Sequence, residues 1–329
     1  RSCHAESPAH GPAMYQMNTG FIRAGYPSAG SWLTYGLGSE NRNLPGFVVL
    51  QNSKGSKGGA GNWGSGFLPS EFQGTALRAR GVPILNLNRP AELSGERQRR
   101  MLDLAGDLNR DHAARFPGEP DLTGRVESFE LAFRMQMAAS DAVNLASEPE
   151  SIRKLYGLDQ EVTRPYGEKC LLARRLVERG VRFVQATHGY WDQHEDLTRD
   201  HGRLALEVDR PIAGLLRDLK SRGLLDETLV LWGGEFGRTP TLQGKDGRDH
   251  HPHAFTMWMA GGGVRPGFSY GITDDYGFYC VDQKVHVHDL HATLLALLGM
   301  DHEALTYRHA GRDFRLTDIS GRVVTEIFA

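Results

Sequence analysis

Short apolar segments alternate with longer amphipathic segments through the second half of this chain. The apolar segments are rich in β-branched residues or bounded by turn residues, which predicts strands at 181–187, 227–234 and 254–263. The amphipathic segments each end at a glycine, which predicts helices at 168–180, 203–223 and 288–299. Strands that are apolar along their whole length are buried on both faces. The alternation therefore predicts an α/β fold with a mostly parallel central sheet and helices on both faces.

The first half of the chain adds one strand and several helices to this pattern. The segment 46-GFVVLQ-51 predicts a buried strand. Helical periodicity or good helix formers are found at 12–18, 90–116 and 126–147. Between these elements, residues 52–70 form a long Gly/Ser-rich stretch, and loops of such length are usually functional or mobile. In the second half, the predicted helix 203–223 contains Pro211, which indicates a break or a new helix start there.

Size and charge exclude several classes of protein. The chain has 329 residues and a net charge of −2, without the basic excess that binding to nucleic acid or an anionic membrane requires. No apolar run is long enough to span a bilayer. Cys3, Cys170 and Cys280 are odd in number and far apart, so no disulfide framework or Cys-type zinc motif can be read from the sequence, and the formation of one pair stays open. We expect a single domain over residues 1–329 that lacks its N-terminal segment, because Arg1 opens into what looks like the middle of a domain.

Polar residues are concentrated where the predicted strands end. Residues 188-HGYWDQHED-196 follow the strand at 181–187, and 235-EFGRTP-240 follow the strand at 227–234. A third cluster, 245-KDGRDHHPH-253, precedes the strand that starts at 254. Ligands of parallel α/β sheets bind beyond the carboxyl ends of the strands. The three clusters therefore predict one site at that edge of the sheet.

The side chains of these clusters indicate a site for one or two divalent metal ions. The candidate ligands are carboxylates and imidazoles: Asp192, His194, Glu235, Asp249, His250 and, as a reserve for His250, His253. Such a mixture suits Zn²⁺, Mn²⁺ or Fe, and Ca²⁺ less readily. A metal ion there can polarise a phosphoryl or sulfuryl oxygen and lower the pKa of a bound water to about 7.

The same polar clusters have simpler interpretations as well. Arg238 and Arg248 are placed to bind an oxyanion, but Arg238 can equally pair with Glu235 and only hold the loop. A histidine in a loop is more often surface-exposed or hydrogen-bonded than a metal ligand. We expect His251, between the two candidate histidines, to be a bystander. The histidine-rich loop taken alone is therefore compatible with a solvated surface.

The succession of motifs resembles a known bacterial family. The motifs that carry the resemblance are 191-WDQH-194, 235-EFGRTP-240, 247-GRDHHPHAF-255 and 261-GGGVRPG-267. They resemble the DUF1501 family, an uncharacterised group within the alkaline phosphatase/sulfatase superfamily.

Three further segments extend the resemblance over nearly the whole chain. Residues 67–78 and 308–324 look like the planctomycete-type branch of the family. Residues 287–300 are similar to the C-terminal helix of sulfatases and phosphomutases. The resemblance implies an alkaline-phosphatase-like fold that binds one or two divalent ions at the carboxyl edge of its sheet.

The resemblance also assigns candidate ligands. Asp192 and His194 resemble the first Asp and His of one superfamily metal site, and His250 or His253 resembles its later His. Glu235 occupies the acidic position of the strand-end pair that holds a second metal. The usual His neighbour of that acid is replaced here by Phe236. The resemblance therefore implies one metal site more fully than two.

The position of the nucleophile differs from the superfamily pattern. The segment 10-HGPAMYQMNTG-20 keeps the spacing of the proline and the Thr-Gly pair, and it puts His10 where sulfatases carry the cysteine that becomes formylglycine. Histidine can act as a nucleophile toward phosphoryl groups, as a general base or as a metal ligand. It cannot become formylglycine. The expected catalytic residues are therefore His10, Arg238 and Arg248.

Two hypotheses of different classes follow. In the first, the protein is a metal-dependent hydrolase of phosphate or sulfate esters that acts on a small-molecule or glycan substrate. In the second, it is a superfamily member without catalysis that binds sulfated or phosphorylated glycans outside the cytoplasm. Family members commonly carry twin-arginine export signals, so the resemblance implies a periplasmic or extracellular location.

Overall fold

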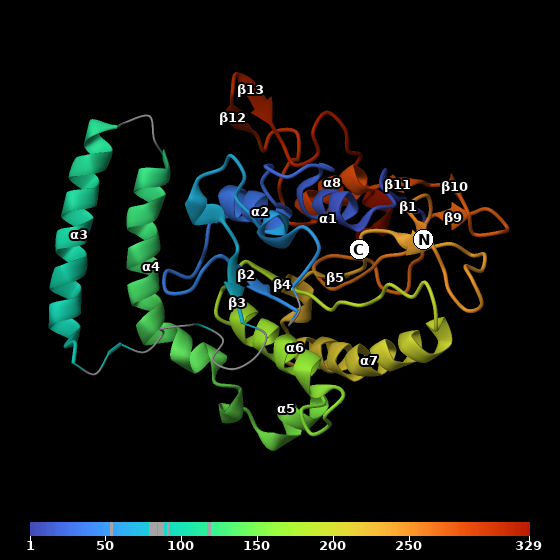
Figure 1. The fold of residues 1–329 in the computed structure, drawn as a ribbon, viewed down its shortest axis with the longest axis horizontal. Coiled ribbons are helices and arrows are strands. Elements are labelled where there is room, and N and C mark those ends of the chain that lie inside the picture. The colour runs from blue at the N-terminus through green and yellow to red at the C-terminus, as the bar shows by residue number, and fades with distance from the viewer. Residues whose placement is uncertain (53–54, 79–83, 85–88, 91, 117–119) are drawn as a thin grey trace.

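The structure is a computed structural model, and it describes residues 1–329 except 53–54, 79–83, 85–88, 91 and 117–119 (Figure 1). Part of the predicted 52–70 loop and one residue of the predicted 90–116 helix lie outside the described residues. Helices α3 (Gly95–Arg115) and α4 (Pro120–Val143) form a hairpin that extends from one end of the molecule. Arg99 of α3 donates a 2.9 Å hydrogen bond to Glu130 of α4. Both chain termini lie toward the opposite end (Figure 1).

A three-stranded parallel sheet forms the first part of the core. Strand β2 (Phe47–Leu50) lies between β3 (Thr75–Leu77) and β4 (Phe183–Ala186). All four residues of β2 are buried, because neighbouring strands cover both of its edges and side chains cover both of its faces. The predicted strands at 46–51 and 181–187 are therefore confirmed.

The predicted single central sheet is not found within the described residues. Strand β5 (Val230–Trp232) pairs antiparallel with β8 (Trp258–Ala260), and these two form a sheet of their own. Strands are present inside the predicted ranges 227–234 and 254–263. However, β8 is antiparallel to β5, and no described strand lies between β4 and β5 to join the two sheets. The expectation of a mostly parallel sheet is therefore wrong for this half. Apolar content predicts that a segment is a buried strand, but not which way its neighbour runs.

The remaining strands form short pairs around this core. They are β1 (Cys3–His4) with β11 (Val285–His286), β6 (Gly237–Arg238) with β7 (His250–His251), β9 (Ile272–Thr273) with β10 (Cys280–Asp282), and β12 (Tyr307–His309) with β13 (Arg312–Phe314). Of these pairs, β6–β7 builds the candidate site.

Helices cover both sides of the strands, as the sequence predicts (Figure 1). The helices beside the strands are α1 (His10–Thr19), α2 (Ala29–Leu37), α6 (Arg164–Val177), α7 (Leu197–Ser221) and α8 (Val287–Leu297), and a short α5 (Glu150–Leu155) precedes α6. Short 3₁₀ turns lie at Gly59–Asn62, Ser70–Phe72, Leu145–Ser147, Leu225–Glu227 and Thr325–Ile327. Val48 and Leu50 of β2 pack with residues of α6 in one apolar cluster. Phe47 and Val49 alternate with them and pack with Trp63 in another. Among the described residues, no helix is both long and apolar enough to cross a membrane.

Helix α7 continues through Pro211, so the predicted break is wrong. Proline removes one backbone donor and disfavours the helical turn before it. Here Pro211 lies on the buried side of α7, together with Leu204 and Val208. Most helical stability in proteins comes from packing of the apolar face, and that packing outweighs the missing hydrogen bond.

Candidate metal centre

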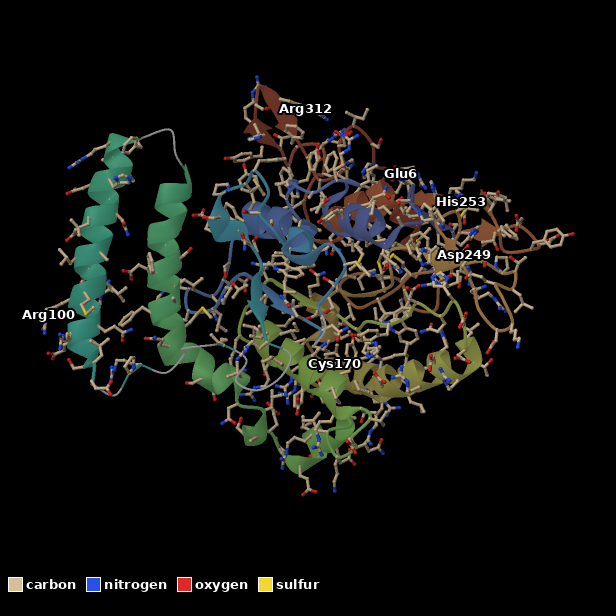
Figure 2. All side chains as sticks on the ribbon, in the orientation of Figure 1. Glu6, Arg100, Cys170, Asp249, His253 and Arg312 are labelled. Carbon is tan, nitrogen blue, oxygen red and sulfur yellow. The ribbon has the colours of Figure 1, made fainter. Side chains whose placement is uncertain are left out.

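The polar clusters that the sequence placed at strand ends meet in the structure. Asp192 and His194 follow β4, Glu235 follows β5, and His250 lies on β7. Strands β6 and β7 pair with Arg238 opposite His250. His10, the first residue of α1, completes the group, which we call the strand-end cluster: His10, Asp192, His194, Glu235, Arg238 and His250. Figure 2 shows Asp249 of the same loop at the opposite end of the molecule from Arg100 on the α3–α4 hairpin.

Asp192 is the centre of the strand-end cluster. Its Oδ1 atom lies 2.9 Å from His194 Nε2, 3.0 Å from His250 Nε2 and 2.7 Å from Arg238 Nη2. Its Oδ2 atom lies 3.1 Å from His10 Nε2. The Nε2 atoms of His194 and His250 are themselves 3.0 Å apart. One carboxylate thus faces three imidazoles and one guanidinium.

Electrostatics keeps the carboxylate of Asp192 ionised. Burial raises the pKa of Asp192, but hydrogen bonds from Arg238, His250 and His10 outweigh burial and hold this pKa well below its ordinary value. The pKa of His10 is raised, first by its hydrogen bond to Glu235, against the opposing effect of burial, and further by Asp192. The cluster therefore holds negative charge that attracts a proton or a metal ion.

The outer nitrogens of the imidazoles are held by fixed acceptors. His250 Nδ1 lies 2.6 Å from the Pro8 carbonyl oxygen, and His10 Nδ1 lies 2.7 Å from Glu235 Oε1. A carbonyl or carboxylate oxygen only accepts, so Nδ1 carries the hydrogen in both rings. With Nδ1 protonated, a hydrogen bond from Nε2 to Asp192 requires a second proton on the ring, and the raised pKa of His10 favours that proton. A ring that gives up the Nε2 proton presents its lone pair to the same space, where a cation can take the place of the proton.

Two groupings of these residues have the geometry to hold a metal ion. His10, Asp192 and His250 offer ligand atoms that lie within 4.8 Å of one another, and so do His194, Asp249 and His250. In known metal sites, a carboxylate or carbonyl oxygen accepts a hydrogen bond from the outer nitrogen of each metal-bound histidine and orients its ring. Glu235 and Pro8 hold His10 and His250 in the same way. The donor set of imidazoles and carboxylates fits Zn²⁺ or Mn²⁺.

The other residues that the sequence singled out lie outside these groupings. His253 is exposed, and its ring lies 5.5 Å from the ring of His251 and 5.6 Å from that of Tyr279 (Figure 2). His251 is buried with Nε2 at the Phe278 carbonyl oxygen, in keeping with a bystander. Arg248 donates to its neighbour Gly247 and keeps part of its side chain at the cavity wall.

Arg238 and Glu235 do not pair with each other. Arg238 binds Asp192 and the Trp191 carbonyl oxygen, at 2.7 and 2.8 Å, while Glu235 binds His10. The alternative in which Arg238 pairs with Glu235 is therefore wrong. Two further contacts, those of Pro8 with His250 and of Gln243 with His194, could not be predicted from the sequence. A backbone carbonyl or a lone amide has no ligand pattern in a sequence.

The strand-end cluster opens into a large cavity of about 1880 Å³. His10, Asp192, Glu235, Arg238 and Arg248 all line this cavity. The Gly/Ser-rich loop contributes Asn52, Gly55, Ser56 and Lys57 to the wall. The loop that the sequence marked as functional or mobile therefore lies beside the candidate site.

Comparison with known protein families identifies one that matches this chain. A family model described as "Protein of unknown function (DUF1501)" matches residues 1–328. No curated protein and no solved structure matches. Because the match spans nearly the whole chain, together with the motifs that build the strand-end cluster, the protein belongs to the DUF1501 family.

Proposed function

We propose that the protein is a metal-dependent hydrolase of phosphate or sulfate esters, within an alkaline phosphatase/sulfatase type of superfamily. One observation carries this proposal. The Nε2 atoms of His10 and His250 and the carboxylate of Asp192 converge, while the outer ring nitrogens are fixed by acceptors. Imidazoles and a carboxylate that converge in this way are typical of a divalent metal site.

His10, Asp192 and His250 would hold the ion. His250 Nδ1 is occupied by Pro8, so both groupings depend on His250 Nε2, and one ion is held at a time. The bound ion would polarise the ester oxygen and lower the pKa of a water molecule to about 7. Both ring nitrogens of His10 have carboxylate partners, which supports the role of a ligand over that of a nucleophile.

The chain's own cations complete the site. Arg238 is bound to Asp192 and holds that carboxylate toward the histidines, so it is a positioning residue. Arg248, whose carbonyl oxygen accepts a hydrogen bond from Arg238, lines the cavity and can neutralise the negative charge of a phosphate or sulfate group. Lys57 is a second cation that lines the same cavity. The cavity is wide enough for a small-molecule ester or the end of a glycan.

Asp192→Asn tests this proposal, because it keeps the shape of the side chain and removes its charge. After dialysis, the unchanged protein should retain about one equivalent of zinc or manganese by plasma emission, and Asp192→Asn should retain almost none. Hydrolysis of p-nitrophenyl phosphate or p-nitrophenyl sulfate with either ion added should fall at least about 100-fold, an effect as large as loss of an oriented metal ligand implies. Asp226→Asn, at an exposed aspartate of a 3₁₀ turn, is the matched control. Equal metal content in the two variants, or equal hydrolysis without metal, would refute the proposal.

A second function is favoured by a specific observation. Both nitrogens of His10 are engaged, and Phe236 stands beside Glu235 where the superfamily carries a histidine, with its ring 4.5 Å from that of His250. These features suit a protein that binds a sulfated or phosphorylated glycan without turnover. Micromolar binding of dextran sulfate that requires Arg248, with no turnover of either ester, would favour this function over hydrolysis.

A further inference from the structure

Two strands in the centre of the molecule have an edge without a partner strand in the described part of the chain. Strand β4 ends the order β3-β2-β4, and β5 ends the order β5-β8. Residues of strands with an open edge are less buried than residues of a strand that is paired on both sides. Val49 in β2, which is paired on both sides, is fully buried, whereas Leu231 and Trp232 of β5 are 37% and 39% exposed. Exposed apolar edge strands are sites where another strand adds.

The large cavity runs along these two edges. It is lined by every residue of 180–193 and every residue of 227–239. Side chains of a strand alternate between its two faces, so a hollow above one face would touch every second residue. Contact with consecutive residues places the hollow beside the backbone of both strands. We call this hollow the strand channel.

The side chains that line the strand channel and its volume indicate what kind of molecule it can bind. Helices on both sides of the strands contribute apolar side chains, among them Ala173 and Val177 of α6 and Leu290 and Leu294 of α8. The volume of about 1880 Å³ exceeds the roughly 300–1,000 Å³ of ordinary small-molecule pockets. The occupant must therefore be long and apolar, and it must also satisfy the backbone donors and acceptors of two strand edges.

A buried polar atom supports an occupant with hydrogen-bonding groups. His291 of α8 lines the strand channel and is 1% exposed. Its Nε2 atom lies 2.9 Å from the Met17 carbonyl oxygen, while its Nδ1 atom has no hydrogen-bond partner among the described residues. A buried acceptor without a partner is costly, and such atoms are usually satisfied by a ligand or an ordered water. An acyl chain offers no donor to this atom, whereas a peptide does.

We propose that the strand channel binds one extended, apolar peptide segment, which pairs with β4 and β5 and joins the two sheets into one. The carboxyl ends of β4 and β5 both lead to the strand-end cluster, where Arg238 contacts Asp192. A segment that runs parallel to them therefore ends beside that cluster. This peptide site shares its cavity with the proposed ester site, but the inference does not depend on hydrolysis.

The test adds strand peptides to the protein of residues 1–329 and follows backbone hydrogen exchange. The panel contains apolar peptides of six or seven residues with lysine tails for solubility, among them a copy of 46-GFVVLQ-51, the strand that is paired on both sides here. Amides of β4 and β5 should exchange about tenfold more slowly or slower still with at least one peptide. The same peptide with a central proline should give no protection, because proline lacks the donor.

Two variants locate the site. Leu231→Arg places a charge in the strand channel and should abolish protection. Leu206→Arg alters an equally apolar residue on α7 that is 66% exposed, and it should leave protection unchanged. Leu231→Ser is a milder second variant, and exchange at β2 reports whether each variant is folded. The proposal is overturned if no peptide protects β4 and β5, if palmitate protects them as well as the peptide, or if the protein alone gains the same protection by dimerising.

Discussion

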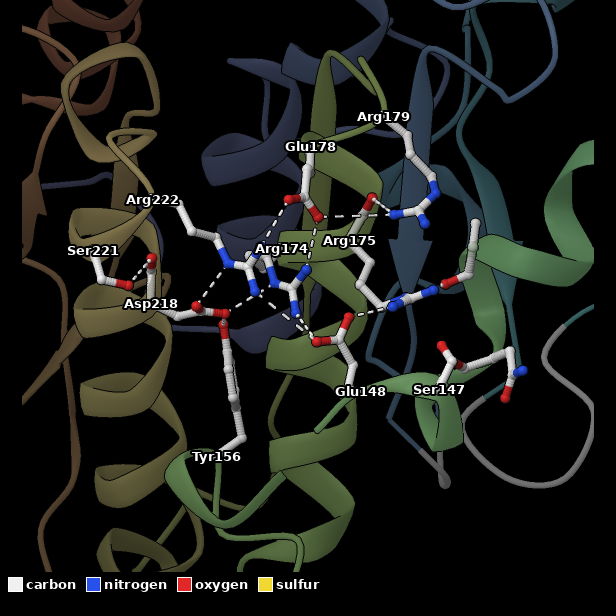
Figure 3. A network of polar contacts seen from close by, with 12 residues as sticks. Ser147, Glu148, Tyr156, Arg174, Arg175, Glu178, Arg179, Asp218, Ser221 and Arg222 are labelled. Atoms are coloured by element: carbon white, nitrogen blue, oxygen red, sulfur yellow. Dashed lines mark hydrogen bonds and ion pairs between the residues drawn. The ribbon is translucent and has the colours of Figure 1, made fainter. Parts of the chain in front are cut away.

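Two charged clusters of this protein use similar residues in opposite ways. The first, which we call the arginine cluster, lies between α6 and α7 and consists of Glu148, Arg174, Arg175, Glu178, Asp218 and Arg222 (Figure 3). The second is the strand-end cluster. Both contain a carboxylate that faces several basic groups, Asp218 buried in the first and Asp192 exposed in the second. They differ in whether the basic groups can lose their protons.

In the arginine cluster, donors meet acceptors. Arg174 is 1% exposed, and its guanidinium nitrogens lie 2.8 Å from Glu148, 2.7 Å from Glu178 and 2.9 Å from Asp218. A guanidinium has only donors and stays charged at any ordinary pH. Each guanidinium nitrogen of Arg174 thus has a carboxylate within ion-pairing distance, although Nε and Nη2 form no aligned hydrogen bond among the described residues. The role of the cluster is to join α6, α7 and the segment before α5.

In the strand-end cluster, titratable imidazoles meet a carboxylate. The imidazole Nε2 atoms point at Asp192, while hydrogens on Nδ1 are already used by Pro8 and Glu235. Imidazoles can lose a proton near neutral pH and bind a metal ion through the freed nitrogen. The comparison teaches that a structural ion network pairs groups whose charges are fixed, whereas a binding site gathers groups that can exchange a proton for a metal ion.

The largest effect is expected from breaking the arginine cluster. Arg174→Ala leaves the carboxylates of Glu148 and Asp218 buried with fewer counter-charges. Breaking a buried ion pair from one side costs about 3–5 kcal/mol of stability. Urea unfolding should show that loss in the free energy of unfolding, with the metal content of the folded fraction unchanged. A loss below about 1 kcal/mol would mean that the cluster is not a structural centre.

His291 gives the next test, because it is a buried basic group that has no carboxylate partner among the described residues. Burial lowers the pKa of His291 to about 4, with further lowering by His288 and His286 and a partial opposing effect from the Met17 carbonyl. Above the ordinary pKa, the ring is neutral in both states. As pH falls from about 6.5 to 4, the unfolded chain takes up a proton that the folded chain refuses, so stability is lost.

The loss from His291 should reach about 3 kcal/mol at pH 4. His291→Gln keeps a donor for the Met17 carbonyl and cannot titrate, so its stability should fall less between pH 7 and 4 than that of the unchanged protein. The difference between the two urea-unfolding curves across pH isolates this residue from other histidines. Parallel pH profiles would show that His291 is not held neutral by burial.

The sequence predicted the elements of the fold better than their assembly. Helices and strands were found near their predicted positions because apolar periodicity and terminal glycines act locally, as at 181–187 and 288–299. The direction of β8 and the open edges of β4 and β5 depend on which segments become neighbours. Pro211 stays inside α7 because packing outweighs a local preference. Pairing and packing over long separations are not encoded in any short stretch.

The candidate site was predicted in part for the same reason. Asp192, His194 and His250 could be grouped because each lies next to a predicted strand. His253 has the same sequence pattern as His250, but it lies outside the strand-end cluster. His250 lies on β7, whereas His253 lies beyond the end of this strand, where its ring faces His251 and Tyr279. The role of His10 came from a resemblance in spacing, and only the structure shows its contact with Glu235.

A smaller effect is expected at the outer layer of the strand-end cluster. Glu235→Gln keeps an acceptor for His10 Nδ1 but removes the charge that raises the pKa of His10. Loss of such an outer partner typically weakens metal affinity by about 10–100-fold. Competition with a fluorescent zinc chelator measures it. Glu207→Gln, which removes the carboxylate 3.0 Å from His188 Nε2, is the matched control and should not weaken binding.

The smallest effect is expected where an ion pair is neither buried nor part of a cluster. Lys154 and Glu150 of α5 are four residues apart, like Arg174 and Glu178 of α6, and their charged atoms are 2.8 Å apart, nearly the same distance as the 2.7 Å of the α6 pair. The Lys154 side chain is 56% exposed and that of Arg174 is 1% exposed. Water already solvates the exposed pair, so Lys154→Ala should change the free energy of unfolding by only about 0.3–0.5 kcal/mol. Equal losses of unfolding free energy for Lys154→Ala and Arg174→Ala would show that the distance and spacing of the charged atoms, rather than their burial, determine how much an ion pair stabilises this protein.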